Sequence, residues 1–559
     1  MRAGTSGVMC SYNRVNGTYA CGDAAGISRD LKGAMGFQGF VQSDWDATHS
    51  TSVAAGLDQE MPMTYDYREV GILAGRHYFD EKNLGALSGA AVDEAATRIL
   101  TPVARLRLLN RSYCTAPCED ALRANVTSAA HTALARAAAA AGIVLLQNDG
   151  VLPLAAPRVR TIAIIGAAAD ARVYDPAGAS QGQGGWHQGD YYSGGGSGHV
   201  TAGTAVVSPL RGIAARARAA GMTVRLSPTN DLSAAVALAR TVDVVIVVGG
   251  TTSGESVDRP NLSLDHGGDA LIAAVAAAAP KTVALVAAPG AFLTPWRGAV
   301  AAAAVLFLGG QESGNAWADV LFGDVPPTGR LPITLPASEA QTIAPSLTET
   351  VRYTEGLATG YRATNATAQS AFPFGHGLTY TSFAFGTPRL GSGTISPVGC
   401  ERPAGEPGCV LCAVLPVTNT GNTTAAAVPQ LYLEVPCLTL TLNLTLTLTR
   451  SQTRTRTPNP NPTNQVPAAG WPVPLLRGFR KTTPIAPGDL VDVPFCLTAR
   501  DLSFYRGGGW VRAAAATAHF GASAGDLRAS LRLPLDQLGE MAGGRAEAKV
   551  AAPEARNVV

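Results

Sequence analysis

The stretch VDVVIVVGG, residues 242–250, decides the fold of the central part of the chain because almost every position in it is apolar. A strand that is apolar on both faces is typical of a parallel sheet covered by helices on its two sides. Similar runs occur at TIAIIG (161–166), MTVRLS (222–227), TVALVAA (282–288) and AAVLFLGG (303–310), separated by helical stretches such as DALIAAVAAAA. This alternation predicts a doubly wound α/β sandwich domain over residues 127–337.

The segment before it, residues 1–115, also alternates strands with helices. VMCSY and GFVQSD have the character of short strands, whereas GISRDLKGAMGF and AAVDEAATRILTPVARLRLL have the character of helices. Such βαβα order implies parallel strands. A closed (β/α)8 barrel needs eight units in about 250 residues, and only two or three fit here. We therefore expect residues 1–115 to be the C-terminal part of a barrel.

The last third of the chain changes character. After a connector at 338–382, short alternating strands with Gly and Pro turns predict a β-sandwich over 383–535. The Thr-, Pro- and Asn-rich stretch 438–466 is interpreted as a low-complexity insert and 536–559 as a tail. The predicted fold class is α/β plus β.

Composition limits the partners. The net charge is +2, from 43 basic and 41 acidic residues, and no long basic run occurs, so the sequence gives no reason to expect nucleic acid. Prolines and charges interrupt the alanine-rich segment near 270–308, which argues against membrane insertion. A neutral small molecule or oligosaccharide fits better as the substrate, and the oligomeric state stays open.

The stretch VQSDWDATHS (41–50) carries the first catalytic candidate, Asp44. An apolar strand runs directly into this acid, and Trp45 follows it. Barrel enzymes keep their chemistry at such strand ends. The alternative is a solvated acid that caps the next helix.

Further blocks decide between these alternatives. VMCSYNRVNG (8–17), GFVQSDWDATHS (39–50), AGLDQEMP (55–62), SGESVDRPNLSL (253–264) and FPFGHGLTYTSF (372–383) together resemble glycoside hydrolase family 3, which contains β-glucosidases and β-xylosidases. The resemblance covers nearly the whole chain. It implies a fibronectin type III-like fold for 383–535 and hydrolysis of glycosides with retention, without cofactor or metal.

A retaining mechanism uses two carboxyl groups about 5–5.5 Å apart. The resemblance makes Asp44 the nucleophile and Glu255, in SGESVDR, the general acid/base. The alternative for Glu255 is a surface acid paired with Arg259. Three other acids rank lower as catalysts: Glu60, Glu312 and Asp46, the last standing where many relatives carry Gly.

A sugar pocket combines an aromatic plate with polar groups. Tyr12 and Trp45 are the expected substrate-binding residues, together with Met9, for which core packing is the preferred alternative. The glycine-rich loop 182–200 is expected to form a flexible wall of the site, with Trp186, Tyr191 or Tyr192 as lining residues. It lacks the GxxxxGK[ST] pattern that a nucleotide site would require.

Processing features point to the extracellular space. Seven Asn-X-Ser/Thr triplets are typical of a secreted glycoprotein; they begin at Asn16, Asn110, Asn125, Asn261, Asn365, Asn422 and Asn443. In the family the SYN block lies late in the barrel, so we expect a chain truncated at its N-terminus, with a signal peptide in the missing part. Cys10 and Cys21 have a spacing that a disulfide can close. A metal site at Cys114 and Cys118, or at Cys409 and Cys412, is disfavoured because no histidines stand nearby.

The predicted function is release of terminal β-D-glucosyl residues. β-Xylosidase is the first alternative, because the cysteine in VMCSYNRVNG is similar to plant xylosidases, but Trp45 beside Asp44 resembles glucosidases. A catalytically inactive carbohydrate-binding fragment is the second alternative.

Overall fold

The computed structural model describes residues 4–61, 78–110, 124–174, 188–200, 203–346, 348, 350–363, 365–391, 408–435, 473–506 and 509–535. These residues form two compact units, divided between Val126 and Thr127. Within the described residues, no helix has the length and apolar character needed to cross a bilayer. Each unit has its own hydrophobic core.

The first unit is a small α/β arrangement. Strands β1 (Gly7–Cys10) and β4 (Phe40–Ser43) pair in parallel, with Cys10 opposite Ser43. A π-helix, Ala25–Ala34, connects them after the hairpin of β2 (Arg14–Val15) and β3 (Thr18–Tyr19). Helices α1 (Glu81–Gly85) and α2 (Gly89–Arg105) follow. The predicted parallel βαβα order is confirmed for these elements.

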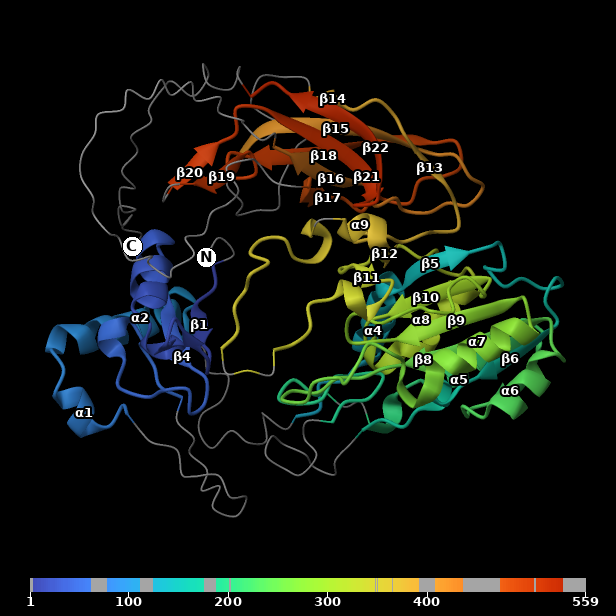
Figure 1. Ribbon diagram of the computed structural model, residues 1–559, viewed down its shortest axis with the longest axis horizontal. Helices are drawn as coiled ribbons and strands as arrows, with labels where there is room; N and C mark the ends of the chain where they lie inside the picture. Colours follow the sequence, from blue (N-terminus) through green and yellow to red (C-terminus); the bar gives the residue numbers. More distant parts are fainter. Residues whose placement is uncertain are drawn as a thin grey trace, which may run out of the picture. The chain divides into compact units, whose positions relative to one another are not determined.

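The second unit contains a six-stranded sheet, teal to yellow-green in Figure 1, in the order β5-β10-β9-β8-β6-β7. All neighbours pair in parallel except β5, which is antiparallel to β10. The strands are β5 (Val144–Asn148), β6 (Thr161–Ile165), β7 (Thr223–Ser227), β8 (Val244–Gly250), β9 (Thr282–Ala287) and β10 (Ala302–Leu306). The five predicted strands are thus confirmed as strands.

Helices cover both faces of this sheet. Ile162 and Ile164 pack in one core cluster with residues of α4 (Ala129–Gly142), α5 (Pro209–Ala219) and α8 (Ser313–Leu321). Ala163 and Ile165 point the other way, into a cluster with α6 (Leu232–Ala239) and α7 (Gly268–Ala278). One expectation is wrong: β7 is not buried on both faces, because it is an edge strand with Leu226 41% exposed.

The second unit continues into two antiparallel sheets, orange and red in Figure 1. In the first, β15 (Cys409–Asn419) pairs with β13 (Phe383–Phe385), β14 (Arg389–Leu390) and β18 (Leu490–Thr498). The second has the order β17 (Leu475–Phe479), β16 (Gln430–Glu434), β21 (Ala516–Ser523), β22 (Asp526–Leu533). Phe495 and Phe520 meet edge to face in the core between the sheets, with ring centroids 5.5 Å apart.

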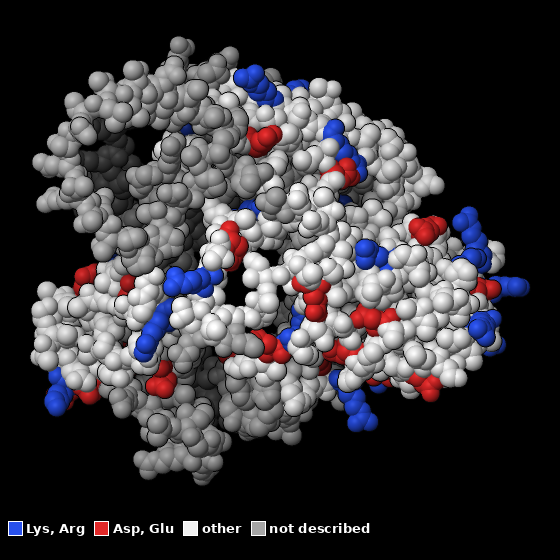
Figure 2. All heavy atoms as spheres, viewed as in Figure 1, with Lys and Arg blue, Asp and Glu red and all other residues white. Residues whose placement is uncertain are grey.

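Smaller elements complete the described chain. They are α9 (Ala366–Gln369), the pair β11 (Leu335–Pro336) and β12 (Ser370–Phe372), and the hairpin β19 (Ser503–Arg506) and β20 (Gly509–Arg512). The insert 438–466, the tail 536–559, Cys114, Cys118 and Trp186 lie outside the described residues. On the face drawn in Figure 2, basic and acidic side chains of described residues are interspersed.

Candidate functional site

Asp44 follows β4 directly, at the carboxyl ends of two parallel strands. Its backbone N–H donates to the carbonyl of Cys10, 3.3 Å away, at the end of β1. The side chain is partly exposed. The strands therefore fix the backbone of this acid at the end of the parallel pair, and the residue stays partly exposed.

The two residues after Asp44 turn the chain sharply. Trp45 has φ 22° and Asp46 has φ 61°, both in the left-handed region. Among non-glycine residues, Asp and Asn tolerate this conformation best. Position 46 is therefore a site where glycine is expected on backbone grounds, which supports Asp44 rather than Asp46 as the chemically important acid.

The predicted sugar-binding residues are exposed. Met9 on β1 is 55% exposed, Tyr12 after β1 is 53% exposed and Trp45 is 42% exposed. The core-packing alternative for Met9 is therefore wrong. All three lie on β1 or on the segments that follow β1 and β4, so their apolar surfaces are available to a ligand of the first unit.

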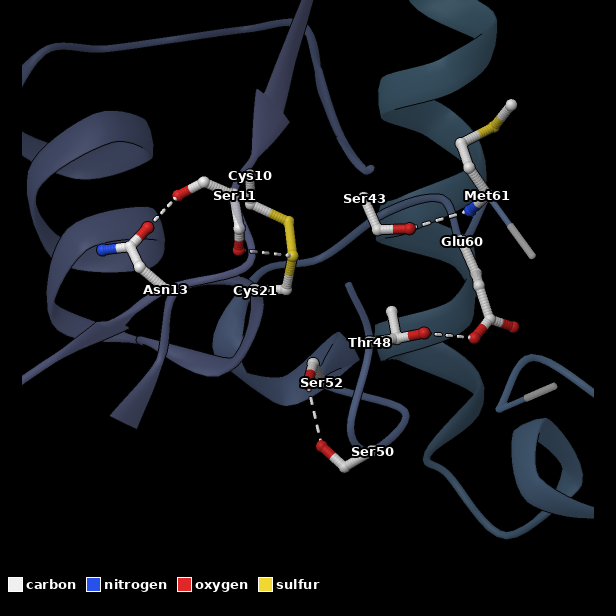
Figure 3. The surroundings of a disulfide bond; sticks show 10 residues. All are labelled: Cys10, Ser11, Asn13, Cys21, Ser43, Thr48, Ser50, Ser52, Glu60 and Met61. Atoms are coloured by element: carbon white, nitrogen blue, oxygen red, sulfur yellow. Dashed lines mark hydrogen bonds between the residues drawn. A yellow bond between two sulfur atoms is a disulfide. The ribbon is translucent and has the colours of Figure 1, made fainter. Parts of the chain in front are cut away.

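A disulfide and an aromatic stack hold the loops after β1 and β4. Cys10 and Cys21 form the expected disulfide, with Cα atoms 5.2 Å apart (Figure 3). Tyr19 stacks on His49, with ring centroids 3.5 Å apart, and the guanidinium of Arg14 lies 4.3 Å from the centre of the Tyr19 ring. No local sequence pattern predicts this stack, because Tyr19 and His49 lie 30 positions apart in the chain.

Two of the rival acids are committed to internal hydrogen bonds. Glu60 is 8% exposed and accepts from Thr48, Tyr78 and Phe79. Glu312 is 4% exposed and accepts from the side-chain amides of Gln311 and Asn315. A carboxylate with this many protein donors stabilises the local structure. We therefore continue to place Glu60 and Glu312 below Asp44 and Glu255 as catalytic candidates.

Glu255 lies in the loop that follows β8, at the carboxyl ends of the parallel strands. Among the parallel strands the order is β7-β6-β8-β9-β10, so that the first strand in sequence, β6, lies between the second and the third. Open α/β sheets bind ligands outside the carboxyl ends of the strands at such a reversal of order. The loops after β6 and β8 flank this point, and Glu255 stands five residues after the end of β8.

The glycine-rich loop contacts Glu255 directly. The Ser197 N–H donates to Oε2 of Glu255 over 2.7 Å, and the Glu255 N–H donates to the Gly195 carbonyl over 3.3 Å. The Ser197 hydrogen bond holds the pKa of the Glu255 carboxyl below its usual range. Arg259 donates instead to the Ala291 carbonyl, over 2.7 Å, so the alternative of a Glu255–Arg259 pair is wrong.

Only glycine fits beside Glu255 at position 196. Gly196 has φ 103°, and a Cβ there would lie 2.3 Å from the Glu255 Cβ. Asp190 shapes the same loop by accepting from the N–H groups of Tyr174, Tyr192 and Ser193. The sequence predicted that this loop forms a flexible wall of the site. It did not reveal the contacts that Gly196, Ser197 and Asp190 make.

The expected lining tyrosines differ from each other. Tyr191 is half-buried under Gly250 and its hydroxyl lies 3.3 Å from Oδ2 of Asp265. Tyr192 is only 4% exposed, and its hydroxyl donates to the Ala171 carbonyl. Tyr192 is therefore a core residue, whereas Tyr191 is partly exposed.

Among the described side chains, no three His, Cys, Asp or Glu residues lie close enough together to hold a metal ion. Cys409 is bonded to Cys496 rather than held for a metal with Cys412. A cysteine in a disulfide is not a thiolate ligand.

The fold and the position of Glu255 define an α/β protein with a carboxylate near the carboxyl ends of the parallel strands of its sheet. Residues 143–380 match the glycosyl hydrolase family 3 C-terminal domain. The chain is 34% identical over 562 residues to the β-glucosidase cel3A of Pyricularia oryzae, covering 94% of this chain and 70% of that protein.

The chain is also similar to solved structures of β-glucosidases. A β-D-glucoside glucohydrolase from Trichoderma reesei superposes with a TM-score of 0.77 at 30% identity, over 95% of this chain and 73% of that one. The β-glucosidase DesR from Streptomyces venezuelae, solved with D-glucose, gives a TM-score of 0.73 at 25% identity, over 95% of this chain and 76% of that one. The chain belongs to glycoside hydrolase family 3, and it is a glycoside hydrolase.

Proposed function

We propose that this protein removes terminal β-D-glucosyl residues from β-glucosides by a two-step retaining mechanism, with Asp44 as nucleophile and Glu255 as general acid/base. The observation that carries the proposal is the similarity to β-glucosidases along 94% of the chain. The partly exposed Asp44 at a strand end and Glu255 at the reversal of sheet order support the two roles.

In the first step the Asp44 carboxylate attacks the anomeric carbon while the bond to the departing oxygen breaks. Glu255 gives its proton to that oxygen, and a glucosyl ester of Asp44 is formed. In the second step Glu255 takes a proton from water, the water oxygen attacks the same carbon, and the ester bond breaks. Two inversions leave the β configuration in the product and restore both carboxyl groups.

The hydrogen bond from Ser197 bears on the second role of Glu255. It stabilises the ionised carboxylate, and this is the form that accepts a proton from water. The protonated form, needed to assist departure of a poor leaving group, is correspondingly favoured at lower pH.

The proposal extends to architecture and location. The first unit is interpreted as the C-terminal part of a (β/α)8 barrel, with β1 and β4 as two of its strands. The paired antiparallel sheets of residues 383–535 are interpreted as a fibronectin type III-like domain. The sequons and the Cys10–Cys21 disulfide support secretion, since disulfides persist in oxidising compartments.

Hydrolysis of an aryl β-glucoside and an aryl β-xyloside, followed by NMR of the first-formed sugar, tests the proposal. We expect a higher kcat/KM for the glucoside and β-glucose as the first product. α-Glucose would contradict the two-step mechanism, and preference for the xyloside would make the protein a β-xylosidase. Binding of a β-glucoside without turnover would favour a carbohydrate-binding role.

A further inference from the structure

Glu60 is the centre of a buried hydrogen-bond network in the first unit, and Figure 3 shows its bond to Thr48. One oxygen of its carboxylate accepts from the Thr48 hydroxyl over 2.6 Å. The other accepts from the backbone N–H groups of Tyr78, over 3.0 Å, and Phe79, over 2.8 Å. Glu60 and Thr48 are 8% and 3% exposed. This carboxylate therefore faces protein donors rather than solvent.

The segment that carries Glu60 also runs alongside β4. The Ser43 N–H donates to the Gln59 carbonyl over 2.9 Å, and the Met61 N–H donates to the Ser43 hydroxyl over 2.8 Å. The Asp46 N–H donates to the Met61 carbonyl over 3.4 Å. Residues 59–61 thus hold Ser43, immediately before Asp44, and Asp46, two residues after it.

The segment 44–48, here called the Asp44 turn, needs such support. Its residues Trp45 and Asp46 both have positive φ. Consecutive non-glycine residues in this region persist only when the surrounding structure holds them there. Ser43 ties the start of the turn, and the bond from Thr48 to Glu60 ties its end.

We infer that Glu60 is a positioning residue, which fixes the Asp44 turn and thereby the direction of the Asp44 carboxylate toward the sugar. The inference rests on the proposed role of Asp44. A carboxylate suits this task because it is only an acceptor, so it receives the Thr48 hydroxyl and two backbone N–H groups at once. Glutamine keeps one carbonyl oxygen and therefore preserves only part of the network.

Thr48→Val tests the inference most gently, because it removes the hydroxyl and keeps the shape of the side chain. We expect kcat on an aryl β-glucoside to fall about 10- to 100-fold, since small misplacements of a reacting group are costly, while KM stays within about twofold. Thr48→Ser restores the hydroxyl and is expected to recover most of kcat. Glu60→Gln is expected to lie between wild type and Glu60→Ala.

Asp58→Asn is the matched control. Asp58 is a buried carboxylate two residues from Glu60, 4% exposed, and it binds Lys32 and the Val41 N–H without any bond to the Asp44 turn. This variant is expected to lower stability while kcat per folded molecule changes little. An equal loss of kcat in Asp58→Asn and Thr48→Val would show that disturbance of the unit, and not positioning, causes the effect, and would overturn the inference.

Amide hydrogen exchange separates this inference from the proposed function. Thr48→Val is expected to speed exchange at Asp46 and Ala47, whereas Asp58→Asn is not. If the wild-type protein hydrolyses no β-glucoside, the proposed function fails, and faster exchange in the Asp44 turn still supports the positioning role. Unchanged exchange in Thr48→Val overturns it, whatever the activity.

Discussion

At the scale of single residues, the backbone separates two acids that stand two positions apart. Asp44 continues from a strand, whereas Asp46 has the left-handed conformation that glycine adopts without strain. Asp46 therefore fits its position as a turn residue. Asp44 does not need its side chain for the turn, which leaves the carboxylate for chemistry.

The pair of variants Asp44→Gly and Asp46→Gly separates these roles. Asp44→Gly should lower turnover of an aryl β-glucoside by several powers of ten, because no glucosyl ester can form. Added azide should then give α-glucosyl azide. Asp46→Gly should keep activity within roughly tenfold, since it relieves backbone strain. Inactivity of Asp46→Gly alone would reverse the assignment.

Ser197 lowers the pKa of the other catalytic candidate, Glu255, first through its backbone N–H and second through its side chain. The Ser197 N–H lowers the pKa of Glu255, so removal of this donor must raise that pKa. The acid role requires the protonated form, and the basic limb of kcat/KM on a disaccharide therefore follows the pKa of Glu255.

Ser197→Pro removes the N–H and should move this basic limb to higher pH. Ser197→Ala keeps the backbone donor and should shift the limb less. pH–rate profiles of the three proteins on a β-linked glucose disaccharide provide the measurement. A basic limb at the same pH in all three would mean that another group controls it.

At the scale of elements, close helix packing depends on glycines. Gly212 of α5 lies against Gly314 of α8, and a Cβ at 212 would come within 2.2 Å of the Gly314 carbonyl. A Cβ at 314 would come within 2.0 Å of the Ser208 carbonyl. The two backbones can approach this closely only because neither residue has a side chain.

Gly212→Ala should therefore lower the free energy of unfolding by about 1–3 kcal/mol. Gly142→Ala is the control, because it also lies in a helix of this layer and its Cβ would meet nothing closer than 3.8 Å. It should be neutral or stabilise by up to roughly 1 kcal/mol. Urea unfolding followed by circular dichroism compares the two, and equal stabilities would refute the packing argument.

At the scale of the whole molecule, the segment FPFGHGL connects the α/β layer with the antiparallel sheets inside the second unit. His376 contacts the Leu146 carbonyl of β5 over 2.7 Å. Gln430 of β16, 3% exposed, donates to the Gly375 carbonyl over 2.9 Å. The same few residues thus bind both layers.

This junction should weaken in mild acid. Burial lowers the pKa of His376, and the charge of Arg330 acts in the same direction, while the Leu146 hydrogen bond and Asp526 oppose them. The unfolded chain therefore binds the proton more readily, so stability falls as the pH drops below the ordinary histidine pKa of about 6.5.

Thermal unfolding between pH 7 and 5 tests this coupling. The wild-type protein should lose stability over the range, and His376→Gln, which retains a donor for Leu146, should lose less. Asp526 and Arg330 are unchanged in this variant, so the difference reports on the imidazole. Parallel pH curves for the two proteins would assign the acid sensitivity to other groups.

Apolar periodicity alone determined the parallel strands β6, β8, β9 and β10, because strands buried on two faces must be apolar throughout. The ordered motifs also marked Asp44 and Glu255 and the chemistry of the family. Local patterns did not reveal β5 as an antiparallel neighbour of β10, or β7 as a half-exposed edge, since both depend on which strands come to lie side by side.

Tertiary structure alone decided the surroundings of the two acids. It brings Ser197 to Glu255 across 58 residues, and Thr48 to Glu60 across 12. It also gives Trp45 and Asp46 the positive φ that separates Asp44 from its neighbour. Such contacts follow from packing of segments distant in the chain, and each residue type involved is equally common in solvated loops. The sequence therefore singled out the two acids as candidates, and the fold determined what holds them.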